Sequence, residues 1–218
     1  MKTKPGVRKI PVSAVSVTGV AIALPYESTL ERDYVTPLLF DQDVEEVVSQ
    51  PLRIDYVDEE GKARHYTPDY KVVFRDGPTR LSEIKYRKDL DNKREELERK
   101  FKAARAYCEQ LGWEFHVHDE FEIRTPRLGN TQFLWRHFVQ LEKPLGGEAE
   151  AILEAFAARH GEPATQGEIL EPLYADPNLR GQAIWCWWAM VVRRMLLCDL
   201  DVLLSTRTLY WPAARVQA

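Results

Sequence analysis

The stretch that decides the fold runs from residue 66 to residue 86 and reads YTPDYKVVFRDGPTRLSEIKY. Its first part belongs to a β-like segment at 64–74, and its last part belongs to another at 79–86. The sequence Asp-Gly-Pro at 76–78 is a turn signal between the two segments. The pattern predicts an antiparallel run of strands, near whose ends two carboxylates and a lysine converge.

The two ends of this stretch, Pro68-Asp69 and Glu83-Ile84-Lys85, have the composition of a metal site. Alternate side chains of a strand share a face, so Glu83 and Lys85 point the same way while Ile84 points into the core. Asp69 and Glu83 would each offer a carboxylate oxygen and Ile84 its backbone carbonyl, which are ligands that Mg²⁺ prefers. A metal-held water would attack phosphorus, and Lys85 would orient that water and offset the growing charge. The motif predicts a nuclease that uses Mg²⁺, for which Mn²⁺ is expected to substitute.

A structural explanation of the same residues stays open. Glu83 and Lys85 alone would be a solvent-facing pair on an exposed strand, and Asp69 after Pro68 would be a turn residue. The complete pattern lies on two candidate adjacent strands before a long helix. This context favours the catalytic interpretation.

A third acid is expected upstream, and Glu31 is the candidate. It lies at the start of a predicted helix over 27–40, where Ser28-Thr29-Leu30-Glu31 also reads as a capping box. In that case Glu31 would bind its own helix terminus. The residues alone leave the metal-ligand and capping roles equally open.

Composition sets limits on the class of protein. The chain has 218 residues, 44% hydrophobic and 29% charged, with a net charge of −4, which is typical of a globular protein and argues against one that coats nucleic acid. Its three cysteines are few, odd in number and without metal-ligand spacing, which argues against a disulfide framework or a zinc site and fits the reducing cytoplasm. Apart from a short apolar stretch at 12–24, no segment approaches the roughly 20 apolar residues of a membrane span.

Hydrophobic periodicity predicts two domains joined by a linker at 143–147. Residues 1–143 alternate between helices and strands, with a further β-like segment at 44–56 and a helical segment at about 128–141 that ends the domain. A strand at 113–117 returns to the sheet parallel to the strand before the long helix. Residues 148–218 read as helices at 148–160, 166–174 and 178–197 with short apolar segments at 202–204 and 208–211. Three helices and a small hairpin predict a winged-helix-like domain.

Four segments together resemble the TnsA family of transposon endonucleases: residues 26–34, 50–51, 66–70 and 82–85. The resemblance extends from about residue 14 to about residue 140. It implies a PD-(D/E)xK nuclease with a restriction-endonuclease-like mixed sheet flanked by helices. It also implies catalytic roles for Glu31, Asp69, Glu83 and Lys85, with Glu31 as a further metal ligand.

The resemblance implies partners as well. Members of that family cleave the 5′ ends of a transposon while a TnsB-like DDE transposase processes the 3′ ends, and a TnsC-like AAA ATPase regulates the complex. The expected substrate is therefore the DNA of transposon ends. Arg87 and Lys88, just past the catalytic strand, are the candidates for phosphate contact.

The last predicted helix is apolar nearly all round and contains Trp185, Trp187 and Trp188. A DNA-reading helix would expose basic or amide side chains, so this helix is expected to pack in a core or to meet a protein partner. Two rivals to the transposition nuclease stay open. One is a stand-alone repair or defence nuclease with the same core, and the other is a non-catalytic transposition scaffold.

Overall fold

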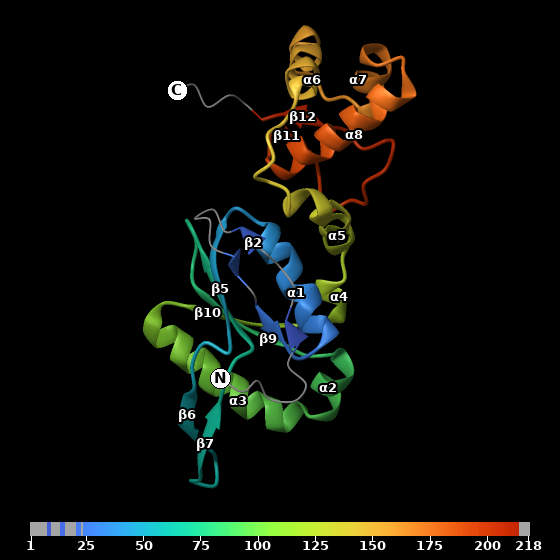
Figure 1. Ribbon diagram of the computed structural model, residues 1–218. Coiled ribbons are helices and arrows are strands. Elements are labelled where there is room, and N and C mark those ends of the chain that lie inside the picture. Colours follow the sequence, from blue (N-terminus) through green and yellow to red (C-terminus); the bar gives the residue numbers. More distant parts are fainter. Residues whose placement is uncertain (1–7, 10–13, 16–20, 23, 214–218) are drawn as a thin grey trace. The chain divides into compact units, whose positions relative to one another are not determined.

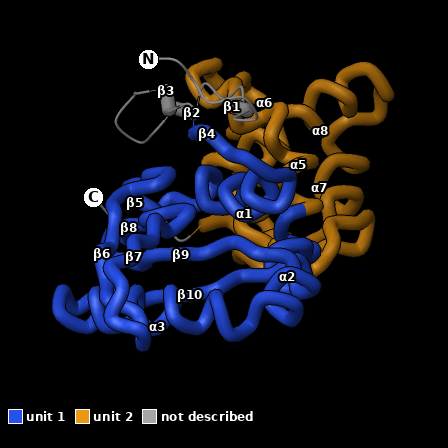
Figure 2. Tube along the Cα trace, turned by 90° about the horizontal axis from the view of Figure 1, so that it is seen from below, with its two compact units in different colours: residues 1–128 blue, residues 129–218 orange. Residues whose placement is uncertain are grey.

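The computed structural model describes residues 8–9, 14–15, 21–22 and 24–213. The chain falls into two units, residues 1–128 and residues 129–218, which Figure 2 colours separately. Each unit has its own secondary structure and its own buried residues, and each is described by itself below.

Unit 1 is built on a mixed four-stranded sheet in the order β10-β9-β8-β5. The strands are β5 (Val44–Ser49), β8 (Tyr70–Phe74), β9 (Arg80–Ile84) and β10 (Glu114–His118). β8 is antiparallel to both β5 and β9, whereas β10 is parallel to β9. The predicted return of a parallel strand after the long helix is therefore confirmed, and the unit has the mixed α/β architecture that the sequence predicted.

Helices cover both faces of this sheet. Figure 2 shows α1 (Thr29–Phe40) on one face and α3 (Arg94–Leu111) on the other. The short helix α2 (Arg87–Asn92) connects β9 to α3, and α4 (Glu120–Ile123) follows β10. α3 ends at Gly112, whose φ of 67° lies in the left-handed region that glycine tolerates best.

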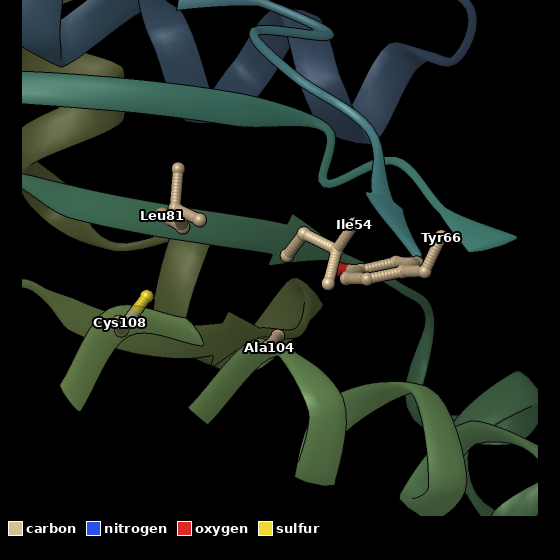
Figure 3. Close-up of a cluster of buried hydrophobic side chains, with 5 residues drawn as sticks. All are labelled: Ile54, Tyr66, Leu81, Ala104 and Cys108. Carbon is tan, nitrogen blue, oxygen red and sulfur yellow. The ribbon is translucent and has the colours of Figure 1, made fainter. Parts of the chain in front are cut away.

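The core between the sheet and α3 contains a cluster of buried side chains, drawn in Figure 3. Ala104 and Cys108 come from the apolar face of α3, and Leu81 comes from β9. Ile54 and Tyr66 complete the cluster from a hairpin at the edge of the unit. Side chains three and four positions apart share one face of a helix, which is why this stripe of α3 lies against the sheet.

The strands predicted at 44–56 and 64–74 are each interrupted. β5 ends at Ser49, because Gln50 takes a φ of 48° and Pro51 follows it. The chain then forms a separate hairpin from β6 (Ile54–Val57) and β7 (Ala63–Tyr66), which Figure 1 shows beside α3. Both predicted strands were therefore too long, and the hairpin between them was missed.

Unit 2 consists of helices and very short strands. The helices are α5 (Pro126–Phe138), α6 (Gly147–Ala158), α7 (Gln166–Leu173) and α8 (Pro177–Val192). β11 (Leu196–Leu197) pairs with β12 (Trp211–Pro212), and an isolated bridge joins Ala164 to Tyr210. The three predicted helices are present, although α8 ends earlier than predicted and residues 202–204 form no strand.

Helix α5 packs with the C-terminal residues, although the sequence placed it with the first domain. Asn130 donates hydrogen bonds to the carbonyls of Leu200 and Val202, both at 2.8 Å. The ring of Phe133 meets Trp188 edge-on with centroids 5.0 Å apart. The division between the units consequently lies at residue 128, ahead of the linker predicted at 143–147.

The tryptophans of α8 pack inside unit 2. Trp187 is fully buried between Phe156 and Tyr210, with ring centroids 5.9 and 5.0 Å away. Trp185 lies 5.7 Å from the ring of His137. Of the two roles that the sequence left open for this helix, these contacts support core packing.

Among the described residues, four strands of two residues each precede α1. They are β1 (Arg8–Lys9), β2 (Ala14–Val15), β3 (Ala21–Ile22) and β4 (Pro25–Tyr26), with β1 paired to β4 and β2 paired to β3. Within the described ranges, no helix combines the length and apolar character needed to cross a membrane.

Candidate active site

The antiparallel pairing of β8 with β9 brings the two halves of the motif together. Tyr70 lies opposite Ser82 in this ladder, and continuing the register by one residue places Asp69 opposite Glu83. The backbone N–H of Ile84 donates to Asp69 Oδ2 at 2.7 Å, which fixes the aspartate against the end of β9. The short connection at 75–79 is what makes this pairing possible, because antiparallel strands can be joined by a tight turn.

Three oxygen atoms converge on the ammonium group of Lys85. Its Nζ lies 2.7 Å from Glu83 Oε1 and 3.2 Å from Asp69 Oδ2, and it donates to the backbone carbonyl of Ile84 at 3.1 Å. Side chains from two strands, Asp69 before β8 and Glu83 on β9, thus meet around one positive charge. The structure brings together Asp69, Glu83, Ile84 and Lys85 as the sequence predicted.

The ammonium group can be regarded as a stand-in for a bound cation, because it contacts the oxygens that were predicted to hold Mg²⁺. Two carboxylates and a carbonyl are hard ligands that suit Mg²⁺, which keeps several waters in its shell. Among the described residues, no group of three or more Asp, Glu, His and Cys side chains is arranged to hold a metal ion. Two carboxylates and one carbonyl are too few to fill the coordination shell of a metal ion by themselves. They suit a Mg²⁺ ion that keeps several of its waters.

Glu83 is the most enclosed member of the group, with its side chain 5% exposed. Its Oε2 accepts a hydrogen bond of 2.6 Å from the hydroxyl of Tyr66, while its Oε1 faces Lys85. Burial, followed by the charge of Asp69, raises the pKa of Glu83, and the contacts with Lys85 and Tyr66 oppose that rise. The sequence did not indicate this contact of Tyr66, because no spacing rule links the end of a hairpin to a strand residue 17 positions later.

Lys85 is held in its charged form. Burial, the largest influence, lowers the pKa of Lys85, but the charges of Asp69 and Glu83 together outweigh it, so the pKa is raised. A lysine with a raised pKa stays protonated at neutral pH. This direction supports charge stabilisation, rather than proton abstraction, as the chemistry open to Lys85.

Glu31 is placed at the N-terminus of α1, where it acts as a capping residue. Its Oε1 accepts from the Ser28 hydroxyl and its Oε2 accepts from the backbone N–H of Glu27, both at 2.9 Å. Burial, together with the charges of Asp69 and Glu27, raises the pKa of Glu31 against these hydrogen bonds. Glu31 is thus within electrostatic reach of Asp69, but the structure does not bring it into contact with the other motif residues.

The two predicted DNA contacts differ in their surroundings. The guanidinium of Arg87 forms an ion pair with Asp119, and its backbone N–H donates to Glu120 Oε2 at 2.8 Å. Lys88 is exposed, and no ion pair joins it to another described residue. Arg87 therefore already has a structural role, whereas the charge of Lys88 is available to a ligand.

A second arginine near the motif was not anticipated from the sequence. Asp33 on α1, with its side chain 6% exposed, accepts from Arg124 Nε at 3.1 Å and also pairs with Arg32. The guanidinium of Arg124 lies 5.8 Å from the ring centre of Tyr86, the residue after Lys85. The side chain of Arg124 remains 45% exposed, so a half-exposed positive charge is held near the end of β9.

Comparison with known proteins gives one match. Residues 41–120 match a family model described as TnsA-like endonuclease N terminal. That range contains Asp69, Glu83, Ile84 and Lys85, whereas Glu31 and the whole of unit 2 lie outside it. No curated protein matches the chain.

Proposed function

Because residues 41–120 form a TnsA-like endonuclease N-terminal domain, we propose that the chain is a Mg²⁺-dependent DNA endonuclease of a transposition system. The observation that carries this proposal is the convergence of Asp69, Glu83 and the Ile84 carbonyl on the Lys85 ammonium. A family match indicates the kind of reaction, and these four residues provide the groups that such a reaction needs.

In this proposal, Asp69, Glu83 and the carbonyl of Ile84 hold the metal. When bound, Mg²⁺ supplies an activated water and withdraws charge from the phosphate. The side chains of the site contribute positioning and charge stabilisation. Asp69 is fixed by the N–H of Ile84, and the protonated Lys85 places a positive charge where negative charge grows on the phosphoryl oxygens.

The reaction is hydrolysis. A water oxygen forms a new bond to phosphorus while the bond from phosphorus to the leaving 3′ or 5′ oxygen breaks, and a proton from the water or solvent ends on the leaving oxygen. Lys85 keeps its own proton throughout, because the charges of Asp69 and Glu83 raise its pKa. No oxidant or further reactant is required.

The substrate and partners of the proposal follow from the family. We assign cleavage to the 5′ ends of a transposon, next to a TnsB-like DDE transposase that processes the 3′ ends and a TnsC-like AAA ATPase regulator. The two rivals are a stand-alone repair or defence nuclease and a non-catalytic scaffold. The intact set of Asp69, Glu83 and Lys85 favours a catalytic subunit over a scaffold.

Contacts to the DNA backbone are assigned to basic side chains next to β9. Lys88 is exposed, and Arg124 is half-exposed and anchored by Asp33, so both can reach a phosphate. Arg87 contributes through the part of its side chain that its ion pair with Asp119 leaves exposed. Glu31 remains in the proposal as a further acid of the site, supported by its electrostatic coupling to Asp69.

Unit 2 is proposed to be a winged-helix-like module that serves subunit contact. The order of its elements supports this: three helices are followed by the β11–β12 pair, with a bridge from Ala164, between α6 and α7, to Tyr210. Trp187 of α8 is buried and Trp185 and Trp188 are half-buried, so much of this helix packs within the unit, which supports a contact role over DNA reading. We place the whole protein in the cytoplasm, supported by its free cysteines Cys108, Cys186 and Cys198.

The test uses end-labelled transposon DNA, the purified chain, and the transposase encoded next to it. Asp69→Ala, which removes one metal ligand, is expected to reduce cleavage at least about a hundredfold, and EDTA is expected to abolish it. Asp55→Ala is the matched control, because Asp55 is an exposed aspartate that pairs with Arg53 at the surface. Cleavage by folded Asp69→Ala in the complete assembly, or in EDTA, would refute the proposal; cutting by the chain without the transposase would favour the stand-alone nuclease.

A further inference from the structure

We propose that Tyr66 is a positioning residue of the active site, which holds the Glu83 carboxylate in the orientation that cation binding requires. This inference rests on the proposed metal-dependent function and adds a residue to it. Tyr66 touches neither Lys85 nor Asp69 in the hydrogen bonds of the site, and it acts through Glu83.

The two oxygens of Glu83 have different partners. Oε2 accepts from the Tyr66 hydroxyl at 2.6 Å, and Oε1 lies 2.7 Å from Lys85 Nζ. A hydrogen bond of this length to a carboxylate is among the strong ones. With Oε2 taken by Tyr66, the carboxylate cannot rotate freely about its last bond, and Oε1 stays turned toward the point on which Asp69 and the Ile84 carbonyl also converge.

The hydroxyl of Tyr66 is itself fixed by the packing of its ring. Tyr66 is 6% exposed and belongs to the cluster with Ile54, Leu81 and Ala104, where Figure 3 shows its ring against Ile54. Phe115 of β10 meets the ring edge-on with centroids 6.5 Å apart. Pairing of Tyr66 with Ile54 in the hairpin ladder fixes the backbone as well.

Rigid outer partners of this kind matter for metal sites. If a ligand side chain is mobile before the cation binds, the free energy needed to order it weakens binding. Removal of a residue that hydrogen-bonds to a metal ligand typically lowers metal affinity or activity by about 10- to 100-fold. Without the hydroxyl, Glu83 Oε2 would be a buried acceptor with no protein donor. The carboxylate would then turn to find another partner, and Oε1 would leave its place.

The test is Tyr66→Phe in the full chain, since this change removes one oxygen and keeps the ring in the core. Tyr34→Phe is the matched control. The Tyr34 hydroxyl donates to Ser82 Oγ at 2.7 Å, so this control also loses one buried hydroxyl bond, to the residue next to Glu83, but no contact with a carboxylate. Ile54→Val, which trims the packing against the same ring, controls for loosening of the core.

Two readouts are needed. Mn²⁺ and Mg²⁺ binding to the DNA-free proteins is measured by calorimetry, and DNA cleavage is measured as a function of metal concentration in the assembly. Tyr66→Phe is expected to weaken cation binding by about 10- to 100-fold and to shift cleavage to higher metal concentration, with activity partly recovered at saturation. Tyr34→Phe and Ile54→Val are expected to bind the cation as the wild type does.

The possible failures are distinguishable. Wild-type affinity for the cation in folded Tyr66→Phe would overturn the role of Tyr66 and leave the proposed nuclease intact. Equal weakening in Tyr66→Phe and Ile54→Val would assign the effect to packing, and would overturn the positioning role as well. A wild-type chain that binds no divalent cation and cuts no DNA would overturn the proposed function, and the role of Tyr66 with it.

Discussion

Lys85 separates two carboxylates that would otherwise face each other. Its Nζ is within 3.2 Å of Asp69 and 2.7 Å of Glu83, and the side chain of Glu83 is almost fully buried. Burial and the charge of Asp69 raise the pKa of Glu83, and the contacts with Lys85 oppose that rise. In the proposed nuclease, the lysine therefore has two separable effects, one on the stability of the site and one on the reaction.

Replacement of Lys85 by methionine separates these effects. Lys85→Met is expected to reduce single-turnover cleavage at least about a hundredfold, because the negative charge that grows on the phosphoryl oxygens is no longer stabilised by the Lys85 ammonium. Lys71→Met is the control, since Lys71 on β8 also pairs with a glutamate, Glu46, at 2.8 Å. Cleavage by folded Lys85→Met at the rate of the control would show that Lys85 only compensates charge in the fold.

A half-buried histidine, His118, gives unit 1 a pH dependence. Burial lowers the pKa of His118 below its usual 6.5, with His116 and Arg80 lowering it further and Glu122 opposing them. The Nε2 of His118 is buried without a hydrogen-bond partner, and the ring lies against Tyr34. Below pH 6.5 the unfolded chain consequently binds more protons at this residue than the folded chain does.

His118 therefore lowers the free energy of unfolding as the pH falls through about 6.5, the pKa of histidine in the unfolded chain. This loss of stability levels off below the pKa of His118 in the folded chain. Urea unfolding from about pH 8 to about pH 5 is expected to show a smaller loss in His118→Asn than in the wild type. The slope from one proton is at most about 1.4 kcal/mol per pH unit. Parallel stability curves for the two proteins would contradict this account.

At this scale, the sequence predicted which motif residues come together better than it predicted their surroundings. Asp69, Glu83 and Lys85 were predictable because their spacing follows from two strands and a turn. Tyr66 was not, because its contact with Glu83 depends on where a separate hairpin packs. The capping geometry of Glu31 was one of two roles that the sequence had left equally open.

At the scale of elements, backbone conformation set the limit of prediction. The pattern at 44–56 has the residues of one strand, but the positive φ of Gln50 and the proline after it end β5 and start a new hairpin. The alternation of apolar and polar side chains can be read from a sequence. The positive φ of a glutamine cannot, because few residues other than glycine adopt it. Helix α1, in contrast, was predictable because Ser28 marks its start.

The same limit applies to α5. Its apolar residues predicted a helix, and periodicity does not say which unit a helix packs against. The contacts of Asn130, Phe133 and His137 with residues 185–204 place it in unit 2. A linker rich in glycine and proline was the visible signal, whereas the boundary between units follows the buried contacts.

At the scale of the whole molecule, one side chain joins distant parts of unit 2. Asn130 is 3% exposed, donates to the carbonyls of Leu200 and Val202 at 2.8 Å, and accepts from the N–H of Leu204 at 3.0 Å. These bonds span 70 or more residues of sequence. They hold the loop between β11 and β12 against α5.

Asn130→Ala is therefore expected to lower the free energy of unfolding of unit 2 by about 3 kcal/mol, because three backbone groups lose their partner. Chemical denaturation followed by tryptophan fluorescence measures this, since Trp188 and Trp185 pack against Phe133 and His137 of the same helix, α5. Gln182→Ala, an exposed change on α8, is expected to stay within about 0.5 kcal/mol of the wild type. Equal stability of the two variants would show that the loop is held by other contacts.

The register of β8 with β9 also determines which length changes this protein can accept. One residue inserted within β9 would exchange the faces of Glu83 and Ile84, turning the acid toward the side now occupied by isoleucine. One residue inserted in the connection at 75–79 would lengthen a turn and leave every paired position in place. Insertions are thus expected to be tolerated in the connection at 75–79, whereas the length of β9 must be kept.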